Sequence, residues 1–156
     1  MITIPDRLWE LMYDEFKRAK RNVERVAYLD GVALDDGGIA TTLVIPDAQL
    51  AVGWYDVPTG AMSQAGAHFR AFKLVRLAQV HTHPKEWVEH SDRDSEKAYS
   101  QELGTVSIVV PFHGKHRPAP QECGVNVRDA DGWRLVDATE ARSIVRLVPT
   151  FLDFRR

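Results

Sequence analysis

The residues best able to do chemistry lie in one short stretch of the chain. The tetrapeptide His-Thr-His-Pro at positions 81–84 follows the apolar run Leu77–Val80, and Asp94 comes soon afterwards. Two histidines two residues apart can aim their rings at one point if the chain bends between them. Imidazole nitrogens and carboxylate oxygens bind zinc, and a catalytic zinc keeps three protein ligands and one open position for water. The stretch therefore predicts a zinc site held by His81, His83 and Asp94.

A serine completes this stretch. Ser91 and Asp94 are three residues apart, so they would share one face of a helix whose N-terminus adds positive potential beside a reacting oxygen. The same residues also form the pattern Ser-x-x-Asp, a capping box that begins many ordinary helices. The two interpretations are compatible, since Ser91 can cap a helix and face a metal. Each half of the pattern is common alone, whereas the whole arrangement is much more specific.

The spacing resembles the signature of the JAMM (MPN+) zinc metalloproteases. In that family an upstream glutamate precedes His-[Ser/Thr]-His-Pro, and a serine and an aspartate follow the second histidine at a fixed offset. Here the intervening residues are Pro84–His90, and Ser91 and Asp94 fall on the pattern without a gap. The resemblance covers roughly Asp6–Val110. It implies an α/β fold, a single JAMM/MPN domain with a cytidine-deaminase-like mixed β-sheet flanked by helices.

The resemblance also implies a role for each residue of the site. His81, His83 and Asp94 would hold Zn²⁺. Glu24 would take a proton from a zinc-bound water and later return one to the leaving amine. Ser91 would donate a hydrogen bond to the tetrahedral oxyanion. All five positions are present, so the chain does not resemble the family's inactive members.

Glu24 lies where the family places its glutamate, at the beginning of the first core strand. The segment Asn22–Gly31 carries it in this chain. The alternative for Glu24 is a solvent-facing charge ahead of a strand. Glu86 and Glu89 are rival acids closer to the histidines in the sequence, but a loop would hold them less firmly.

The activity that the resemblance implies is that of an isopeptidase or peptidase. Known members of the family act on ubiquitin or ubiquitin-like proteins, and prokaryotic relatives act on ubiquitin-like or sulfur-carrier proteins. The partner would be a ubiquitin-like protein or its conjugates, with its C-terminal tail laid across the zinc as an added strand. The compact length fits a small prokaryotic-type member.

Other interpretations fit the motif to different degrees. A non-catalytic MPN scaffold that binds a partner stays open, and so does a protease that processes a sulfur-carrier protein. A metallo-β-lactamase-like site is disfavoured, because it wants an aspartate two residues after the second histidine and a histidine beside it, where this chain has Lys85 and Glu86.

Length and composition limit the other classes of protein to which the chain can belong. The chain has 156 residues, 44% of them hydrophobic and 27% charged, which fits one globular domain over residues 1–156. With 20 basic and 22 acidic residues, nucleic acid is not expected as a partner. No apolar run suits a signal peptide or a membrane span. Cys123 is the one cysteine, so a cytoplasmic location is expected, while the oligomeric state is left open.

Hydrophobic periodicity predicts mixed helices and strands around the motif. An amphipathic helix is expected over Asp6–Lys20, and Ala141–Val148 fits a helix or a strand. Turns are expected at Asp35–Gly38 and Asp129–Gly132. The other expected elements are strands at Val23–Leu34, Ile39–Ile45, Leu50–Val57, Thr105–Val110, Gly124–Val127 and Trp133–Val136, and helices at Met62–Leu74 and Ser91–Leu103. Residues expected to face the core are Leu8, Trp9, Met12, Phe16, Tyr28, Trp54, Met62, Phe69, Phe72, Leu74, Cys123 and Trp133.

The other histidines and one tryptophan receive separate predictions. His90 adjoins Ser91 and either supports a ligand or lies in the loop. Trp87 either contacts substrate or packs over the site. His68, His113 and His116 are expected at the surface or in loops.

Overall fold

The computed structural model of the chain describes residues 1–19 and 22–155. The strands are β1 (Ile2–Pro5), β2 (Val26–Leu34), β3 (Gly37–Val44), β4 (Gln49–Leu50), β5 (Tyr55–Asp56), β6 (Val75–Thr82), β7 (Val106–Val110), β8 (Gly124–Arg128), β9 (Trp133–Leu135) and β10 (Val145–Val148). The helices are α1 (Asp6–Arg18), α2 (Thr59–Phe72), α3 (Asp92–Lys97) and α4 (Ala138–Ile144), with short 3-10 turns η1 (Pro111–Gly114) and η2 (Pro120–Glu122).

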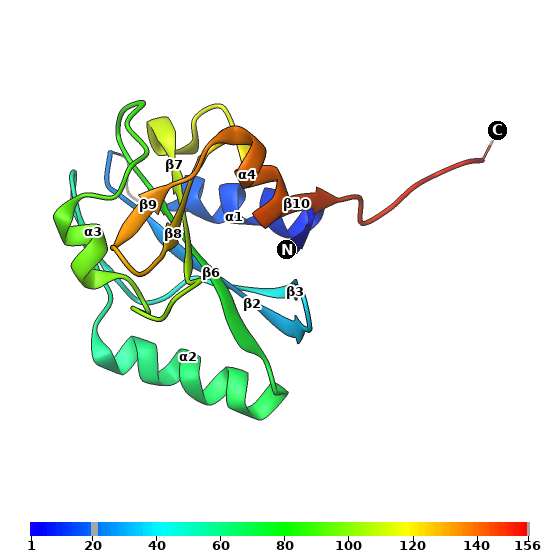
Figure 1. The fold of residues 1–156 in the computed structure, drawn as a ribbon, viewed down its shortest axis with the longest axis horizontal. Coiled ribbons are helices and arrows are strands. Elements are labelled where there is room, and N and C mark those ends of the chain that lie inside the picture. The colour runs from blue at the N-terminus through cyan, green and yellow to red at the C-terminus, as the bar shows by residue number, and fades with distance from the viewer. Residues whose placement is uncertain (20–21, 156) are drawn as a thin grey trace.

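A curled mixed sheet forms the centre of the structure. Eight strands follow one another in the order β10-β1-β3-β2-β6-β7-β8-β9, and β4 and β5 form a separate two-stranded sheet (Figure 1). The strand β1 is parallel to both β3 and β10, and β6 is parallel to β7, whereas the other neighbours in the large sheet are antiparallel. Helices flank this sheet, so the predicted α/β class is confirmed.

The two faces of the sheet bury different sets of side chains, because side chains alternate along a strand. On one face, Ala27 and Leu29 of β2 belong to the main core together with residues of α1 and α4. On the other face, Val26 and Tyr28 pack with Tyr55 of β5 and with residues of α2. In Figure 1, α1 and α4 accordingly lie across the sheet from α2.

The helix α1 matches its sequence pattern. Trp9, Met12 and Phe16 are buried as predicted, and Leu8 is partly buried. The indole N–H of Trp9 and the hydroxyl of Tyr13 both donate to the carbonyl of Pro118, at 2.9 and 2.6 Å. The helix ends at Arg18, and the predicted last residue, Lys20, lies outside the described residues.

The first hairpin is confirmed with small shifts of its bounds. The strand β2 begins at Val26 rather than at Val23, and β3 already begins at Gly37 within the predicted turn. Gly31 is required where these strands meet, because a Cβ there would lie 2.0 Å from the carbonyl oxygen of Ile39. The single strand predicted over Leu50–Val57 is wrong, because this segment turns back on itself between β4 and β5.

Two helix predictions need correction. The helix α2 begins at Thr59, and its residue Phe72 is 66% exposed although it was expected to face the core. The helix predicted over Ser91–Leu103 is wrong beyond Lys97, where α3 ends. There the backbone N–H of Tyr99 donates to the Gln79 side-chain oxygen at 3.2 Å, a tertiary contact that replaces helical pairing.

The remaining strands agree with the sequence, with one addition. The strand β7 and the β8–β9 hairpin lie where they were predicted. The segment at residues 141–148 is both helix and strand, because α4 ends at Ile144 and β10 begins at once. The strand β1 was not predicted. Of the aromatic residues expected in the core, Tyr28 is buried, whereas Trp54 is 38% exposed and that prediction is wrong.

Among the described residues, no helix combines the length and the apolar character that a membrane span requires.

Candidate metal centre

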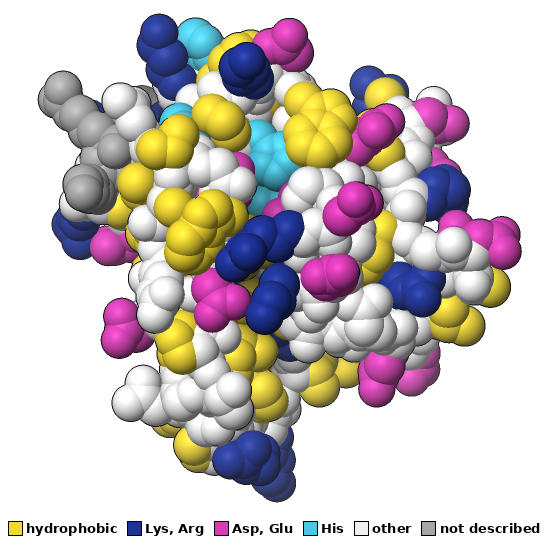
Figure 2. All heavy atoms as spheres, turned by 90° about the vertical axis from the view of Figure 1, so that its left-hand side faces the viewer, with side chains coloured by type: hydrophobic (Ala, Val, Ile, Leu, Met, Phe, Trp, Pro, Cys, Tyr) yellow, Lys and Arg dark blue, Asp and Glu magenta, His cyan; other side chains and the backbone are white. Residues whose placement is uncertain are grey.

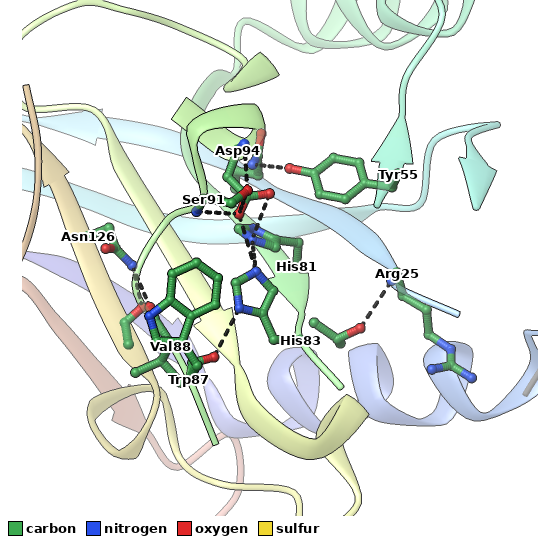
Figure 3. A network of polar contacts seen from close by, with 12 residues as sticks. Arg25, Tyr55, His81, His83, Trp87, Val88, Ser91, Asp94 and Asn126 are labelled. Atoms are coloured by element: carbon green, nitrogen blue, oxygen red, sulfur yellow. Dashed lines mark hydrogen bonds and ion pairs between the residues drawn. The ribbon is translucent and has the colours of Figure 1, made fainter. Parts of the chain in front are cut away.

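Three buried donor side chains meet at the carboxyl end of β6. His81 lies in β6, and His83 is the first residue after this strand. Asp94 lies in the first turn of α3. The Nε2 atoms of the two histidines are 3.3 Å apart. The Asp94 carboxylate lies 3.5 Å from His81 Nε2 and 3.2 Å from His83 Nε2 (Figure 3). The structure thus brings together the three side chains that the sequence predicts as ligands.

The two rings converge without the bend that was expected from the sequence. The backbone N–H of His83 donates to the carbonyl of Val110, and the carbonyl of His83 accepts from the backbone N–H of His113. His83 therefore continues the pairing of β6. Side chains two residues apart on an extended segment point to the same side. His81 and His83 therefore face the same point because of strand alternation alone.

This donor set fits a metal ion in both geometry and chemistry. Ligand atoms about 2.0–2.2 Å from one ion at tetrahedral angles lie roughly 3.3 Å from each other, and the distances of 3.2–3.5 Å between the donor atoms here match that spacing. Three atoms that each present a lone pair repel at this distance unless a proton or a cation lies between them. Within the described residues, these are the three side chains that could hold a metal ion together.

The loop that follows β6 fixes the orientation of His83. Its Nδ1–H donates to the backbone carbonyl of Trp87 at 2.9 Å, which leaves Nε2 free to bind a metal. The Trp87 ring stacks on the imidazole with centroids 5.1 Å apart. Burial lowers the pKa of His83, but the Asp94 carboxylate and the Trp87 carbonyl raise it more, so the net shift is upward. The pKa of His81 is lowered, because burial outweighs Asp94.

Ser91 and Asp94 form the predicted capping box, and they do so at the edge of the metal centre. The Ser91 hydroxyl accepts from the Asp94 N–H, while the Asp94 carboxylate accepts from the Ser91 N–H at 2.8 Å and from its hydroxyl at 2.6 Å. Burial raises the pKa of Asp94, but the hydrogen bonds to His81, His83 and Ser91 have a larger, opposite effect. The net pKa is well below the ordinary range. Asp94 is therefore ionised at neutral pH.

Glu24 lies beside the metal centre, two residues before β2. Its side chain is buried, and its backbone N–H donates to the carbonyl of Ala51 at 2.7 Å. Burial raises the pKa of Glu24 to about 7, although the charge of His83 opposes the shift. A carboxyl group with a pKa near neutrality can take up and release protons in turn. The rival acids Glu86 and Glu89 are both exposed.

A pocket of about 240 Å³ opens next to the ligands. It is lined by Glu24, Gly53, His83, Pro84, Lys85, Trp87 and Ser91. The space-filling view shows histidine side chains at the floor of a hollow, with hydrophobic side chains on either side of it and basic side chains nearby (Figure 2). Glu24 therefore lines the same pocket as His83 and Ser91.

The sequence did not predict that two further residues lie beside the centre. The Tyr55 ring lies 5.2 Å from the His81 ring, and its hydroxyl accepts from the Gln79 amide at 2.6 Å. His113, expected only at the surface or in a loop, has Nδ1 3.3 Å from the Thr82 hydroxyl. Both residues come from segments distant in sequence, so no local pattern could have pointed to them.

The comparisons with known proteins place the fold but not the activity. No protein-family model matches the sequence, and a search among curated proteins gives no match. The solution structure of a protein from Desulfitobacterium hafniense matches with a TM-score of 0.72 at 18% identity, over 96% of this chain and 94% of that one. The solution structure of a protein from Salinibacter ruber matches with a TM-score of 0.57 at 17% identity, over 88% and 89% of the two chains.

A third solved structure matches less well. It is the crystal structure of a JAB1/MPN domain protein from Archaeoglobus fulgidus, with a TM-score of 0.47 at 14% identity, over 87% of this chain and 95% of that one. The chain therefore shares its fold with the first two proteins, and the case for a function depends on the site itself.

Proposed function

We propose that this chain is a zinc-dependent peptidase or isopeptidase of the JAMM type. The observation that carries the proposal is the triangle of donor atoms from His81, His83 and Asp94, with distances of 3.2–3.5 Å. Two imidazoles and one carboxylate form a donor set of catalytic zinc sites, and they leave one position open. The buried Glu24 lines the pocket beside His83, where a proton carrier is needed.

The residues of the site would divide the work as follows. When bound, zinc would supply a Lewis acid that polarises a water molecule and the scissile carbonyl. Glu24 would take a proton from the attacking water and deliver one to the leaving nitrogen, as general base and then general acid. Ser91 lines the same pocket, and its hydroxyl would donate to the developing oxyanion after exchanging its present acceptor, the Asp94 carboxylate.

The substrate that we propose is the C-terminal tail of a ubiquitin-like protein or of its conjugates. The pocket is small, and Gly53 and Trp87 line it together with His83. Such a site suits an extended segment with small residues at the bond to be cut, held by main-chain hydrogen bonds. The motif resemblance favours this class of substrate, and a sulfur-carrier protein with a similar tail is the closest alternative. We also propose that the protein acts in the cytoplasm.

The metal content of the purified protein is the first test. About one zinc per chain is expected for the wild type and for Glu24→Gln, whereas His81→Ala and His83→Ala should lose it. The exposed Glu86 provides a matched control, because Glu86→Gln changes the same chemical group outside the pocket. A wild type that takes up no zinc even when zinc is supplied would leave a binding module that retains the motif.

Activity is tested on tails joined to a reporter by a peptide bond or by a lysine isopeptide bond. Tails of ubiquitin-like and sulfur-carrier proteins are compared, with cleavage followed by mass spectrometry. Cleavage should stop in Glu24→Gln at unchanged zinc content and should continue in Glu86→Gln. Normal cleavage by Glu24→Gln would assign the proton transfer to another acid.

A further inference from the structure

His90 is partly buried between the metal centre and β9. Its ring centroid is 5.6 Å from that of His81 and 4.5 Å from that of Trp133. Both of its ring nitrogens are buried, and neither has a hydrogen-bond partner. Buried polar atoms in folded proteins are nearly always paired, because an unpaired one costs free energy. The position of this imidazole therefore calls for a physical reason.

His81 also has a ring nitrogen without a hydrogen-bond partner. Its Nε2 faces the other two donor atoms, which leaves Nδ1 on the opposite side of the ring, and this Nδ1 is also buried without a hydrogen-bond partner. A histidine that binds a metal almost always donates its second N–H to an acceptor, which fixes the tautomer and the direction of the ring. His83 obeys this rule through the Trp87 carbonyl. His81 is therefore the ligand whose support has still to be identified.

The chemistry of the neighbours favours one acceptor for that N–H. An imidazole carries an acceptor nitrogen beside its N–H, whereas the indole of Trp133 can only donate. The Tyr55 hydroxyl, whose ring also contacts His81, is already paired with the Gln79 amide, whereas neither nitrogen of His90 has a partner. His90 therefore offers a free acceptor in contact range of the His81 ring.

We propose that His90 is a positioning residue for His81, which rests on the proposed metal centre. Its acceptor nitrogen takes a hydrogen bond from His81 Nδ1–H, directly or through one ordered water, and so keeps His81 Nε2 directed at the metal. The two ligand histidines would then be oriented by different means, one by a backbone carbonyl and the other by a side chain. That side chain immediately precedes the capping serine, so the start of α3 would hold two of the three ligands in place.

The experiment compares zinc affinity and imidazole proton signals in matched variants. His90→Phe keeps an aromatic ring and removes both nitrogens, whereas His90→Asn and His90→Gln restore an acceptor. Trp133→Phe is the control, because it removes the indole N–H and keeps the ring contact. Zinc affinity is measured by competition with a chelator, and exchange-protected imidazole protons are observed by NMR of the zinc-loaded protein labelled with ¹⁵N-histidine.

The wild type and Trp133→Phe should both show the protected imidazole protons of His81 and His83. His90→Phe should lose the His81 signal and keep the His83 signal, and its zinc affinity should fall about 10- to 100-fold. At least one of the two amide variants should recover most of that affinity. His90→Leu, which also lacks an acceptor, replaces His90→Phe if the latter does not fold.

Two results would overturn the inference while leaving the metal centre intact. One is His90→Phe with wild-type affinity and both protected protons. The other is an equal loss in Trp133→Phe, which would attribute the effect to packing. A wild type that binds no zinc is a distinct result, because it overturns the proposed function and this inference together.

Discussion

The Ser91 hydroxyl lies 2.6 Å from the Asp94 carboxylate oxygen that also faces His83, so the cap of α3 includes the carboxylate that we propose as a metal ligand. The carboxylate accepts both the hydroxyl and the backbone N–H of Ser91. A change at Ser91 therefore acts on the start of α3 and on the direction of a ligand together.

Ser91→Ala should destabilise the protein by about 0.5–2 kcal/mol, the usual cost of losing a cap. It should also weaken zinc binding, because one of the two hydrogen bonds that orient the carboxylate is lost. Ser91→Thr keeps a hydroxyl and should retain both properties. Urea unfolding and chelator competition measure the two effects. Unchanged zinc affinity together with reduced cleavage would assign the hydroxyl to the oxyanion alone.

Zinc affinity should rise with pH across the range in which His83 loses its proton. The pKa of His83 is above its ordinary value, because Asp94 and the Trp87 carbonyl outweigh burial. Protons compete with zinc below that pKa, so affinity falls as the pH is lowered. Chelator competition between pH 5.5 and 8, set beside direct measurement of released protons, checks this. Affinity that does not change with pH would mean that His83 binds no metal.

The contribution of Glu24 to the stability of the metal-free protein should fall as the pH rises from about 4.5 to about 7. Glu24 holds its proton to a pKa of about 7 in the folded state but releases it near its ordinary value in the unfolded state. Between these values the unfolded state binds fewer protons, so the free energy of unfolding falls with pH, by on the order of 1–3 kcal/mol. Urea unfolding with a chelator at pH 5 and pH 8, compared between the wild type and Glu24→Gln, measures this contribution. Glu24→Gln should abolish that component, and an equal loss in the variant would exclude Glu24 as its source.

The buried ion pair between Arg76 and Asp30 should be sensitive to the loss of either partner. The guanidinium bonds the carboxylate at 2.9 and 3.2 Å and lies 3.7 Å from the centroid of the Tyr28 ring. Asp30→Ala should cost about 3–5 kcal/mol, because it leaves a buried charge unpaired. The exposed pair of Arg155 with Asp153 is the matched control, and Asp153→Ala should cost less than about 1 kcal/mol. Equal costs measured by urea unfolding would contradict the argument from burial.

A substitution at Gly53 should affect substrate binding without affecting folding. A Cβ on Gly53 would meet no atom within 4 Å, and the residue lines the pocket beside His83. Gly53→Val should therefore fold normally and bind zinc normally, while it raises the KM for an extended tail. Gly60, where a Cβ also meets nothing within 4 Å, is the control outside the pocket. An unchanged KM in Gly53→Val would place the substrate elsewhere.

The convergence of the three candidate ligands could be predicted from sequence because they are close together in it. His81, His83 and Asp94 lie within one strand end and one helix start, and strand alternation and a capping box then dictate where they point. The same locality explains the success with α1, whose buried stripe has a clear helical period.

The failures share a cause, because tertiary contacts override local preference there. The helix predicted to Leu103 ends at Lys97, beyond which Tyr99 bonds to Gln79 on β6. No local pattern in the sequence predicts β1, because its partners β3 and β10 are distant in the sequence. Tyr55 likewise reaches the candidate metal centre only through packing.

The placement of β1 between β3 and β10 has a consequence for how the chain folds. Ile2 pairs with Gly38 on one side and with Val145 on the other. During synthesis, β1 can join β3 early, but its second edge stays open until the residues of β10 have emerged. Pairing over such a sequence separation is slow, because a long loop must close before any contact forms. The three candidate metal ligands all precede residue 95, so their site would be able to form while the sheet is still open at that edge.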